Sequence, residues 1–273
     1  MGLEPDGFRL VPKKGGDAMV SEYWQDDYCV QKAVKTPDAG KNSIEALVDG
    51  SWQSFPLVGF PPAFWEWNKS GRREYISIIQ EMQEHGRGNS RKLQLSGPHN
   101  GVVASYGAAR SDSGFALNNA IKGMGFLPKA ALLPDLIGRL QDSLDAPVMH
   151  KLEVLDSMYR DAMDIFEADR VVSLELYAKP GYETQTFINQ MLNPISVIVW
   201  MDIPTFKVKS IVRLLHPDDP GLSEYEQQVT HYVNLIHSYF HGKFPRDYIA
   251  SVYYNVEIYN SSPGSTEGRG SRI

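Results

Sequence analysis

Cysteine is almost absent from the sequence, because Cys29 is the single one among 273 residues. One cysteine cannot form an internal disulfide bond, and it cannot supply a cysteine-rich zinc or iron–sulfur site. Cys29 follows Asp26, Asp27 and Tyr28. Since nearby carboxylates raise the pKa of a thiol, the sequence argues against a nucleophilic role for Cys29.

Long hydrophobic runs are lacking as well. The longest candidate, residues 195–203, has the length of a strand and falls short of the roughly 20 apolar residues that a membrane helix needs. Residues 1–16 are polar and rich in glycine and proline, without the apolar core of a secretory signal. We therefore expect a soluble protein with no transmembrane segment, and the single cysteine favours the cytoplasm.

Positive charge is not in excess. The chain has 27 Lys and Arg residues against 33 Asp and Glu residues, which gives a net charge of -6. This balance argues against a nucleic-acid coat protein and against a polybasic membrane binder. The GxxxxGK[ST] phosphate loop, a GxGxxG following a strand and the GxSxG nucleophile elbow are all missing. The sequence therefore predicts no cofactor.

The residues that are present have an ordinary globular composition, with 42% hydrophobic and 22% charged. Glycine and proline punctuate residues 1–42, which we expect to form a partly ordered N-terminal arm. Residues 52–67 place Phe and Trp around prolines that forbid a regular helix through the middle. We interpret this aromatic segment as a packed part of the core; the alternative is an aromatic-lined pocket or partner site.

Residues 43–168 predict a mixed, mainly helical α+β region. Apolar residues at helical spacing, followed by Gly86, predict the first helix of this region. Pro134 suits the first turn of a later helix, where its missing N–H costs nothing. The expected elements are strands at 92–96 and 102–106, and helices at 72–85, 115–122, 134–144 and 148–168.

Residues 169–262 show the order strand, helix, strand, strand, helix, strand. Alternating apolar and polar residues predict strands at 170–178, 195–202, 206–214 and 248–259. A helix is expected at 181–192, and Ser223 with Glu226 forms a capping box for a second one that ends at Gly242. The fold class is therefore α+β, with a C-terminal ferredoxin-like βαββαβ sandwich after a mixed α/β N-terminal half. Residues 263–273 are expected to be a flexible tail.

One face of this predicted sheet should pack on the helices, and the other should stay free. The free face combines aromatic side chains with charges of both signs, and it is too aromatic for a surface that meets only water. Glu175 and Glu257 on this face would repel phosphates, which disfavours nucleic acid as a partner. We predict that the interaction face contains Trp200, Lys207, Arg213 and Tyr259.

His237 and His241 lie four residues apart, a spacing used by helical metal sites. The glutamate of the HExxH motif is missing, because Ser238 follows His237. Two ligands alone make a weak site, whereas histidines near a helix C-terminus interact favourably with the helix dipole. We therefore predict no metal, with these two histidines as the best candidates.

Together these patterns favour a non-catalytic structural or assembly protein, acting through protein–protein contacts as a homo-oligomer or as a subunit of a larger complex. The missing catalytic motifs, the sticky predicted face and the arm-like ends support this hypothesis. The alternative is a small-molecule enzyme or ligand-binding protein, with a pocket between the C-terminal sheet face and segment 52–67. A buried Glu–Lys pair would favour that alternative. Its candidate acid–base groups are Glu175, Glu257, Tyr177, Tyr253 and Lys209.

Overall fold

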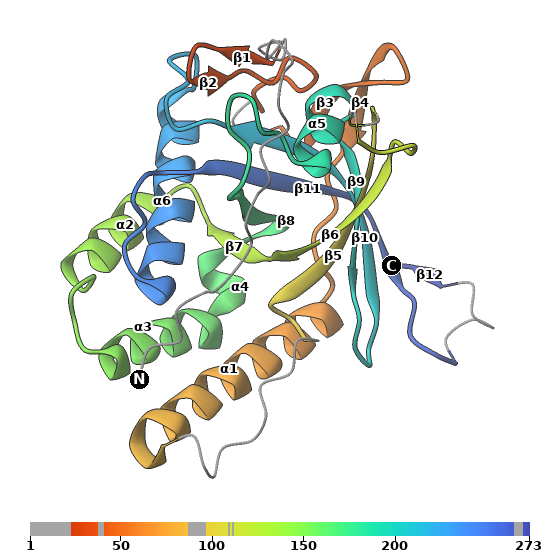
Figure 1. Ribbon diagram of the computed structural model, residues 1–273. Coiled ribbons are helices and arrows are strands. Elements are labelled where there is room, and N and C mark those ends of the chain that lie inside the picture. Colours follow the sequence, from red (N-terminus) through yellow and green to blue (C-terminus); the bar gives the residue numbers. More distant parts are fainter. Residues whose placement is uncertain (1–22, 38–40, 87–96, 109, 111, 265–269) are drawn as a thin grey trace.

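A large curled antiparallel sheet forms the centre of this α+β protein (Figure 1). The computed structural model describes residues 23–37, 41–86, 97–108, 110, 112–264 and 270–273. Neighbouring strands follow the order β6–β5–β9–β10–β11–β8–β7, and the short β12 (Ser271–Arg272) pairs with the end of β11. The strands are β5 (Asn100–Tyr106), β6 (Leu117–Gly123), β7 (Gly125–Pro128), β8 (Phe166–Glu175), β9 (Ile195–Trp200), β10 (Phe206–Leu215) and β11 (Ile249–Asn260).

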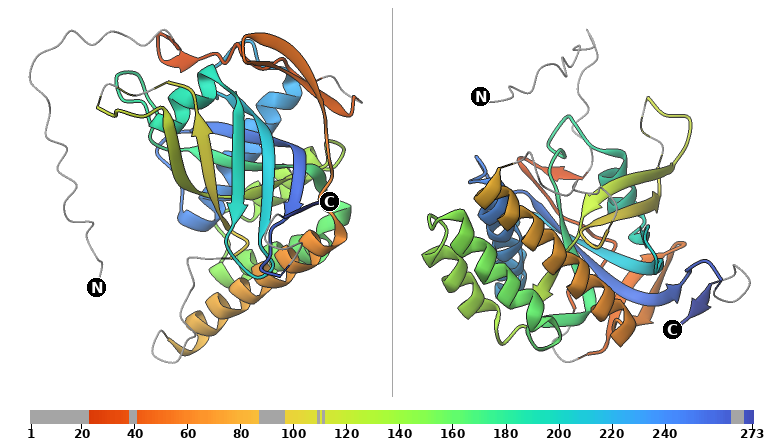
Figure 2. Two further views of the ribbon diagram at one scale, coloured as in Figure 1. Left: turned by 90° about the vertical axis from the view of Figure 1, so that its right-hand side faces the viewer. Right: turned by 90° about the horizontal axis from the view of Figure 1, so that it is seen from below.

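One length of chain joins the two ends of this sheet. β6 pairs with β5 at one end, β7 pairs with β8 at the other, and Met124 alone separates β6 from β7. The sheet must therefore curl until its ends meet (Figure 2). The concave side is narrow as a result: a Cβ atom added to Gly101 would lie 2.8 Å from Cγ2 of Ile198. Only glycine fits there without movement of the neighbouring side chain.

Side chains of two kinds fill the concave side. At one end, the ring of Phe64 lies 5.3 Å from that of Trp200 and 5.2 Å from that of Phe206, between centroids. At the other end the buried side chains are polar, among them the cross-strand pair Ser196 and Ser210. Phe60, Phe64 and Trp65 of segment 52–67 are buried, which agrees with the interpretation of that segment as core, whereas Trp52 is 47% exposed on the strand at 51–56.

Helices cover part of the convex side (Figure 1). α6 (Glu224–His241) packs on β8 and β11, α2 (Leu133–Asp142) packs on α6, and α1 (Pro62–His85) packs along α3 (Val148–Arg160). α5 (Gln185–Leu192) lies beside β5 and β6 at one end of the concave side, where Gln190 donates to Ser196 Oγ and to the Tyr253 hydroxyl. The capping box is confirmed: Ser223 Oγ accepts from the Glu226 N–H, and the Glu226 carboxylate accepts from the Ser223 N–H. Among the described residues, no helix is both long and apolar enough to cross a membrane.

The described N-terminal residues lie against the body of the protein. β1 (Trp24–Gln25) and β2 (Tyr28–Cys29) form a short hairpin, and β3 (Ser43–Val48) with β4 (Ser51–Pro56) forms a second one. Between the hairpins, the buried Gln31 side chain donates to backbone oxygens of α5 and β10. Arg213 Nη1 donates to the backbone oxygen of Gln31 at 3.0 Å, and Arg213 Nε donates to the Glu226 carboxylate at 3.1 Å. This segment is therefore part of the packing around β10.

A buried guanidinium connects α1 to the rest of the protein. Arg72 is 6% exposed, and no carboxylate in the described part of the chain pairs with it. Its nitrogens donate to Asn68 Oδ1 at 2.7 Å, to the Tyr159 hydroxyl at 2.9 Å, and to the backbone oxygens of Pro98 and Met124. Arg72 thus joins α1 to α3 and to the residue that links β6 to β7.

Several elements between residues 43 and 168 differ from the prediction. The predicted helix at 115–122 is wrong, because Leu117–Gly123 forms β6, held by pairing with β5 along its whole length. The predicted helix at 148–168 ends at Arg160, followed by the short α4 (Ala162–Ile165) and by β8. Both errors reflect long-range strand pairing, which overrides local propensity. The helix expected at 72–85 begins earlier, with Pro62 in its first turn. The strand expected at 92–96 lies outside the described residues.

The ferredoxin-like topology is not confirmed. The predicted sequence of elements, from β8 through α5, β9, β10 and α6 to β11, is present. A split βαβ unit needs two parallel strands with one strand between them. Here both β10 and β11 lie between β9 and β8, and three antiparallel steps leave β8 antiparallel to β9. The difference arises because the chain returns from α6 to pair directly with β10, which places β11 inside the sheet.

We expect Arg72→Met to lower the free energy of unfolding by about 3–5 kcal/mol, because several buried acceptors lose their donor. Arg73 offers a matched control, since it pairs with Asp156 at 2.7 Å on the surface. Arg73→Met should cost less than about 1 kcal/mol. Urea unfolding followed by circular dichroism measures both values, and equal losses would contradict the connecting role of Arg72.

Candidate interaction surface

Part of the convex side of the sheet carries no helix (Figure 2, left). Cross-strand pairs define which side chains share this side: Ile121 lies beside Val102, and Val102 lies beside Val199. Tyr106 and Leu117 form a further pair on the same side. The exposed fractions are 76% for Ile121, 64% for Leu117 and 59% for Tyr106. We name this set the outer apolar face; it consists of Val102, Tyr106, Leu117, Ile121, Val197 and Val199.

The polarity of β6 is the reverse of that expected for a strand with one solvated side. Its outward residues Leu117 and Ile121 are apolar and exposed, whereas the inward Lys122 is charged and only 9% exposed. An antiparallel sheet with a solvated side normally directs its polar residues to water. Contiguous apolar side chains left exposed in this way are typical of a contact surface.

A charged rim borders the outer apolar face on β10 and β11. The register places Lys207 beside Val199, so the rim continues the same side of the sheet. Lys209 Nζ lies 2.6 Å from a Glu257 oxygen, and the Tyr259 hydroxyl donates to the same carboxylate at 2.6 Å. These two hydrogen bonds lower the pKa of Glu257, so the rim stays ionised at neutral pH. Lys207 Nζ lies 4.6 Å from the centre of the Tyr259 ring.

Two of the four residues predicted for the interaction face are buried. Lys207 and Tyr259 are half-buried members of the rim, but Trp200 is 0% exposed and Arg213 is 6% exposed. Trp200 lies on the concave side, where the ring of Phe64 packs against it and excludes water. Arg213 lies on the convex side but beneath α6, where it pairs with Glu226. The free surface is therefore displaced toward β5, β6 and β9.

The structure divides the five predicted acid–base residues into two separate pairs and leaves Tyr177 apart from both. Glu175 and Tyr253 lie in the polar part of the concave side, where Glu175 Oε2 is 2.7 Å from Lys122 Nζ. Glu257 and Lys209 belong to the rim, and Tyr177 is 69% exposed. Lys122 was not among the candidates because its segment was predicted as helix. Residues 117–123 show no regular alternation of apolar and polar residues, so the sequence gives no clear local signal of the strand that turns Lys122 inward.

The Lys122–Glu175 ion pair joins β6 to β8, two strands near opposite ends of the sheet. Burial acts to lower the pKa of Lys122, but the Glu175 carboxylate at 2.7 Å outweighs it, so the pKa is raised and the ammonium stays charged. Burial also raises the pKa of Tyr253, against the influence of Lys122, so the phenol stays neutral. Thr184 Oγ1 donates to the second Glu175 oxygen at 3.0 Å. These groups satisfy one another and hold the sheet ends together.

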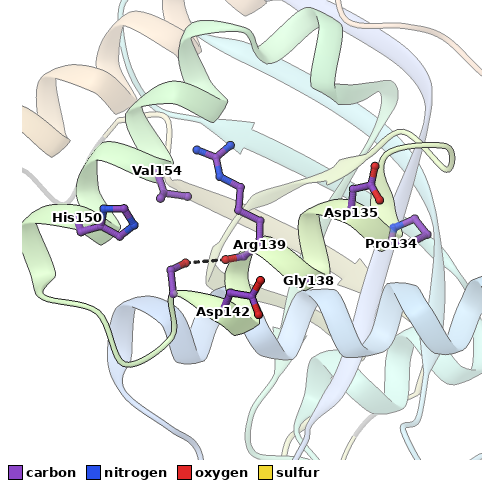
Figure 3. A pocket seen from close by; sticks show the side chains of 8 residues that line it. Pro134, Asp135, Gly138, Arg139, Asp142, His150 and Val154 are labelled. Carbon is purple, nitrogen blue, oxygen red and sulfur yellow. Dashed lines mark hydrogen bonds between the residues drawn. The ribbon is translucent and has the colours of Figure 1, made fainter.

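Two surface pockets lie outside the outer apolar face and its charged rim. A groove of about 640 Å³ between α2 and α3 is lined by Asp135, Arg139, Asp142 and His150 (Figure 3). A pocket of about 340 Å³ lies between the first hairpin and the start of β11, with His216, Asp218 and Arg246 in its wall. Burial lowers the pKa of His216, against Asp218 and Asp219. Neither pocket is lined by residues 52–67, where the alternative hypothesis of a ligand-binding protein expects one.

The remaining candidates occupy ordinary structural positions. The His237 and His241 rings lie 6.4 Å apart, and His237 Nδ1 donates to the Val233 oxygen at 2.8 Å. Within the described ranges, no group of three or more His, Cys, Asp or Glu residues could hold a metal ion. Burial, assisted by Asp219, raises the pKa of Cys29 to about 12, which agrees with a poor nucleophile.

The chain matches no protein-family model and no curated protein sequence, so its chemistry must be inferred from its own surfaces.

We expect Lys122→Met to lower the free energy of unfolding by about 3–5 kcal/mol, because it leaves the Glu175 carboxylate buried without its partner. The exposed pair Lys35–Glu45, at 2.8 Å, provides the control, and Lys35→Met should cost less than about 1 kcal/mol. Urea unfolding measures both changes. A loss for Lys122→Met no larger than that of the control would contradict a bridging role.

A second pair of variants tests the polar part of the concave side. Ser196 Oγ accepts from Gln190 at 3.1 Å, whereas its cross-strand neighbour Ser210 has no partner for Oγ within the described residues. Ser196→Ala should therefore cost about 1 kcal/mol and Ser210→Ala close to none. Thermal unfolding of the two variants measures the difference, and an equal or larger loss for Ser210→Ala would refute this account of the polar layer.

Proposed function

We propose that this protein is a non-catalytic binding protein that holds another polypeptide on the outer apolar face. The observation that carries this proposal is the reversed polarity of β6, which exposes Leu117 and Ile121 while it buries Lys122. Apolar area exposed at fixed strand positions gains free energy when a partner removes it from water.

The charged rim supports the same proposal. Its side chains are oriented by their own contacts, since Glu257 binds both Lys209 and Tyr259. A rigid, polar border beside an apolar centre is the common anatomy of protein interfaces. Such a border contributes more to the choice and orientation of a partner than to affinity.

A second candidate function is small-molecule binding at the 340 Å³ pocket. This proposal is supported by His216, which is 9% exposed and lies in the wall between acidic and basic side chains. Pockets of this volume, with a few convergent polar groups, suit small ligands. A small molecule that raises the melting temperature of the protein, and that loses this effect in His216→Gln, would favour this candidate.

Affinity capture with the full chain as bait tests the lead proposal. We expect the wild-type protein to retain a polypeptide that Ile121→Asp loses. A carboxylate in the centre of an apolar contact would lose its hydrating water on binding, and this loss costs binding free energy. Met163→Asp is the matched control, since Met163 is 52% exposed on α4, away from the outer apolar face. Circular dichroism verifies that both variants fold. Retention that is unchanged in Ile121→Asp would overturn the proposed function.

A further inference from the structure

We infer that the polypeptide covering the outer apolar face is a second copy of this chain, bound as a two-fold symmetric dimer. This inference rests on the proposed function and names its partner. It is drawn from the area of the face, from the distribution of charge around it, and from the pairing that a two-fold axis would create.

The exposed apolar area supplies about half of one side of a dimer interface. Tyr106, Leu117 and Ile121 are each more than half exposed, and the strand register places them on one side of the sheet. At roughly 200 Å² for a large side chain, these three residues expose on the order of 400 Å². One partner of a standard-size interface contributes about 800 Å², and the half-buried valines and the charged rim beside these residues would supply the remainder.

Charge is absent from the outward side chains of β5, β6 and β9, strands that the structure describes in full. These side chains are apolar apart from asparagine, as at Asn119, so two copies can meet there without juxtaposing like charges. The cations of the rim, Lys207 and Lys209 on β10 with Arg272 on β12, all lie on the same side of the face, and the Arg110–Asp112 pair lies in the loop between β5 and β6. A neutral centre suits identical partners, because a charge on the axis would face its own kind.

The position of the rim also selects the direction of the two-fold axis. An axis across the strands would place β10 over β10, so that Lys207 and Lys209 of the two copies would repel one another. An axis parallel to the strands, between β5 and β6, moves the two rims to opposite flanks. In that arrangement each strand β6 lies over β5 of the second copy. Because Tyr106 and Leu117 are cross-strand neighbours, Leu117 of one copy then meets Tyr106 of the other.

Size-exclusion chromatography with light scattering, over a range of concentrations, tests the dimer. We expect wild-type protein to approach twice the chain mass of 30.7 kDa. Leu117→Asp should weaken self-association at least about tenfold, whereas the control Met163→Asp should leave it unchanged. A wild-type protein that stays monomeric overturns the inference, and so does a dimer that Leu117→Asp leaves intact.

A charge-pair experiment tests the predicted contact itself. Both Leu117 and Tyr106 are exposed in the single chain, so Leu117→Asp and Tyr106→Lys leave its core unchanged. Each variant alone should be largely monomeric, and an equimolar mixture should form a heterodimer through one aspartate–lysine contact. A mixture that stays monomeric while the wild-type protein dimerises contradicts this pairing.

The capture experiment separates failure of this inference from failure of the proposed function. If wild-type protein is monomeric but still retains a different polypeptide that Ile121→Asp loses, the second copy is ruled out and the binding function stands. If neither self-association nor capture depends on the outer apolar face, both proposals are overturned.

Discussion

The connection of β6 to β7 through Met124 is the constraint on which the other features depend. One stretch of chain must pair with β5 and then with β8, so the sheet has to curl and its concave side becomes narrow. α1 and α5 reach this side only through side chains at its two ends, such as Phe64 and Gln190. α6 packs outside, on β8 and β11. Arg72 reinforces this point by donating to the Met124 oxygen. Because the helices cover only part of the convex side, the opposite strands are left exposed.

The ion pairs fall into a buried and an exposed group. Lys122 with Glu175 and Arg213 with Glu226 form buried pairs that connect elements, and the loss of either partner would leave the other charge buried without compensation. Exposed pairs lie at several places on the surface, among them Arg73 with Asp156 on the helices and Lys209 with Glu257 beside the outer apolar face. The buried pairs therefore contribute far more to stability than the exposed ones do.

Local signals in the sequence predicted the local elements well. The capping box at Ser223 and Glu226 and the alternation in residues 206–214 correspond to α6 and β10. The sheet order was not predictable in the same way, because it depends on which distant strands pair. The same cause misled the analysis at residues 115–122, whose two asparagines and mixed pattern give no strong local preference until β5 pairs with them.

The candidate site was predictable only in part, for a related reason. Alternation identifies two sides of a strand but not which side is enclosed. Trp200 was assigned to the free side by analogy with a flat sheet, whereas the curl encloses that side. Lys207 and Tyr259 lie half-buried on the convex side, the side that the curl leaves open, because β10 and β11 alternate regularly at that end. The apolar centre of the surface belongs to β6, which was not recognised as a strand.

The Glu226 carboxylate has a consequence for how this protein can evolve. It caps α6 through Ser223, pairs with Arg213 on β10, and accepts from Thr36 Oγ1 at 3.4 Å. Replacing Glu226 alone would leave the guanidinium without a counter-charge and the Ser223 N–H without its acceptor in the capping box. Positions 36, 213, 223 and 226 are therefore expected to covary among homologues, so that an ancestral change at one of them is tolerated only with compensating changes at the others.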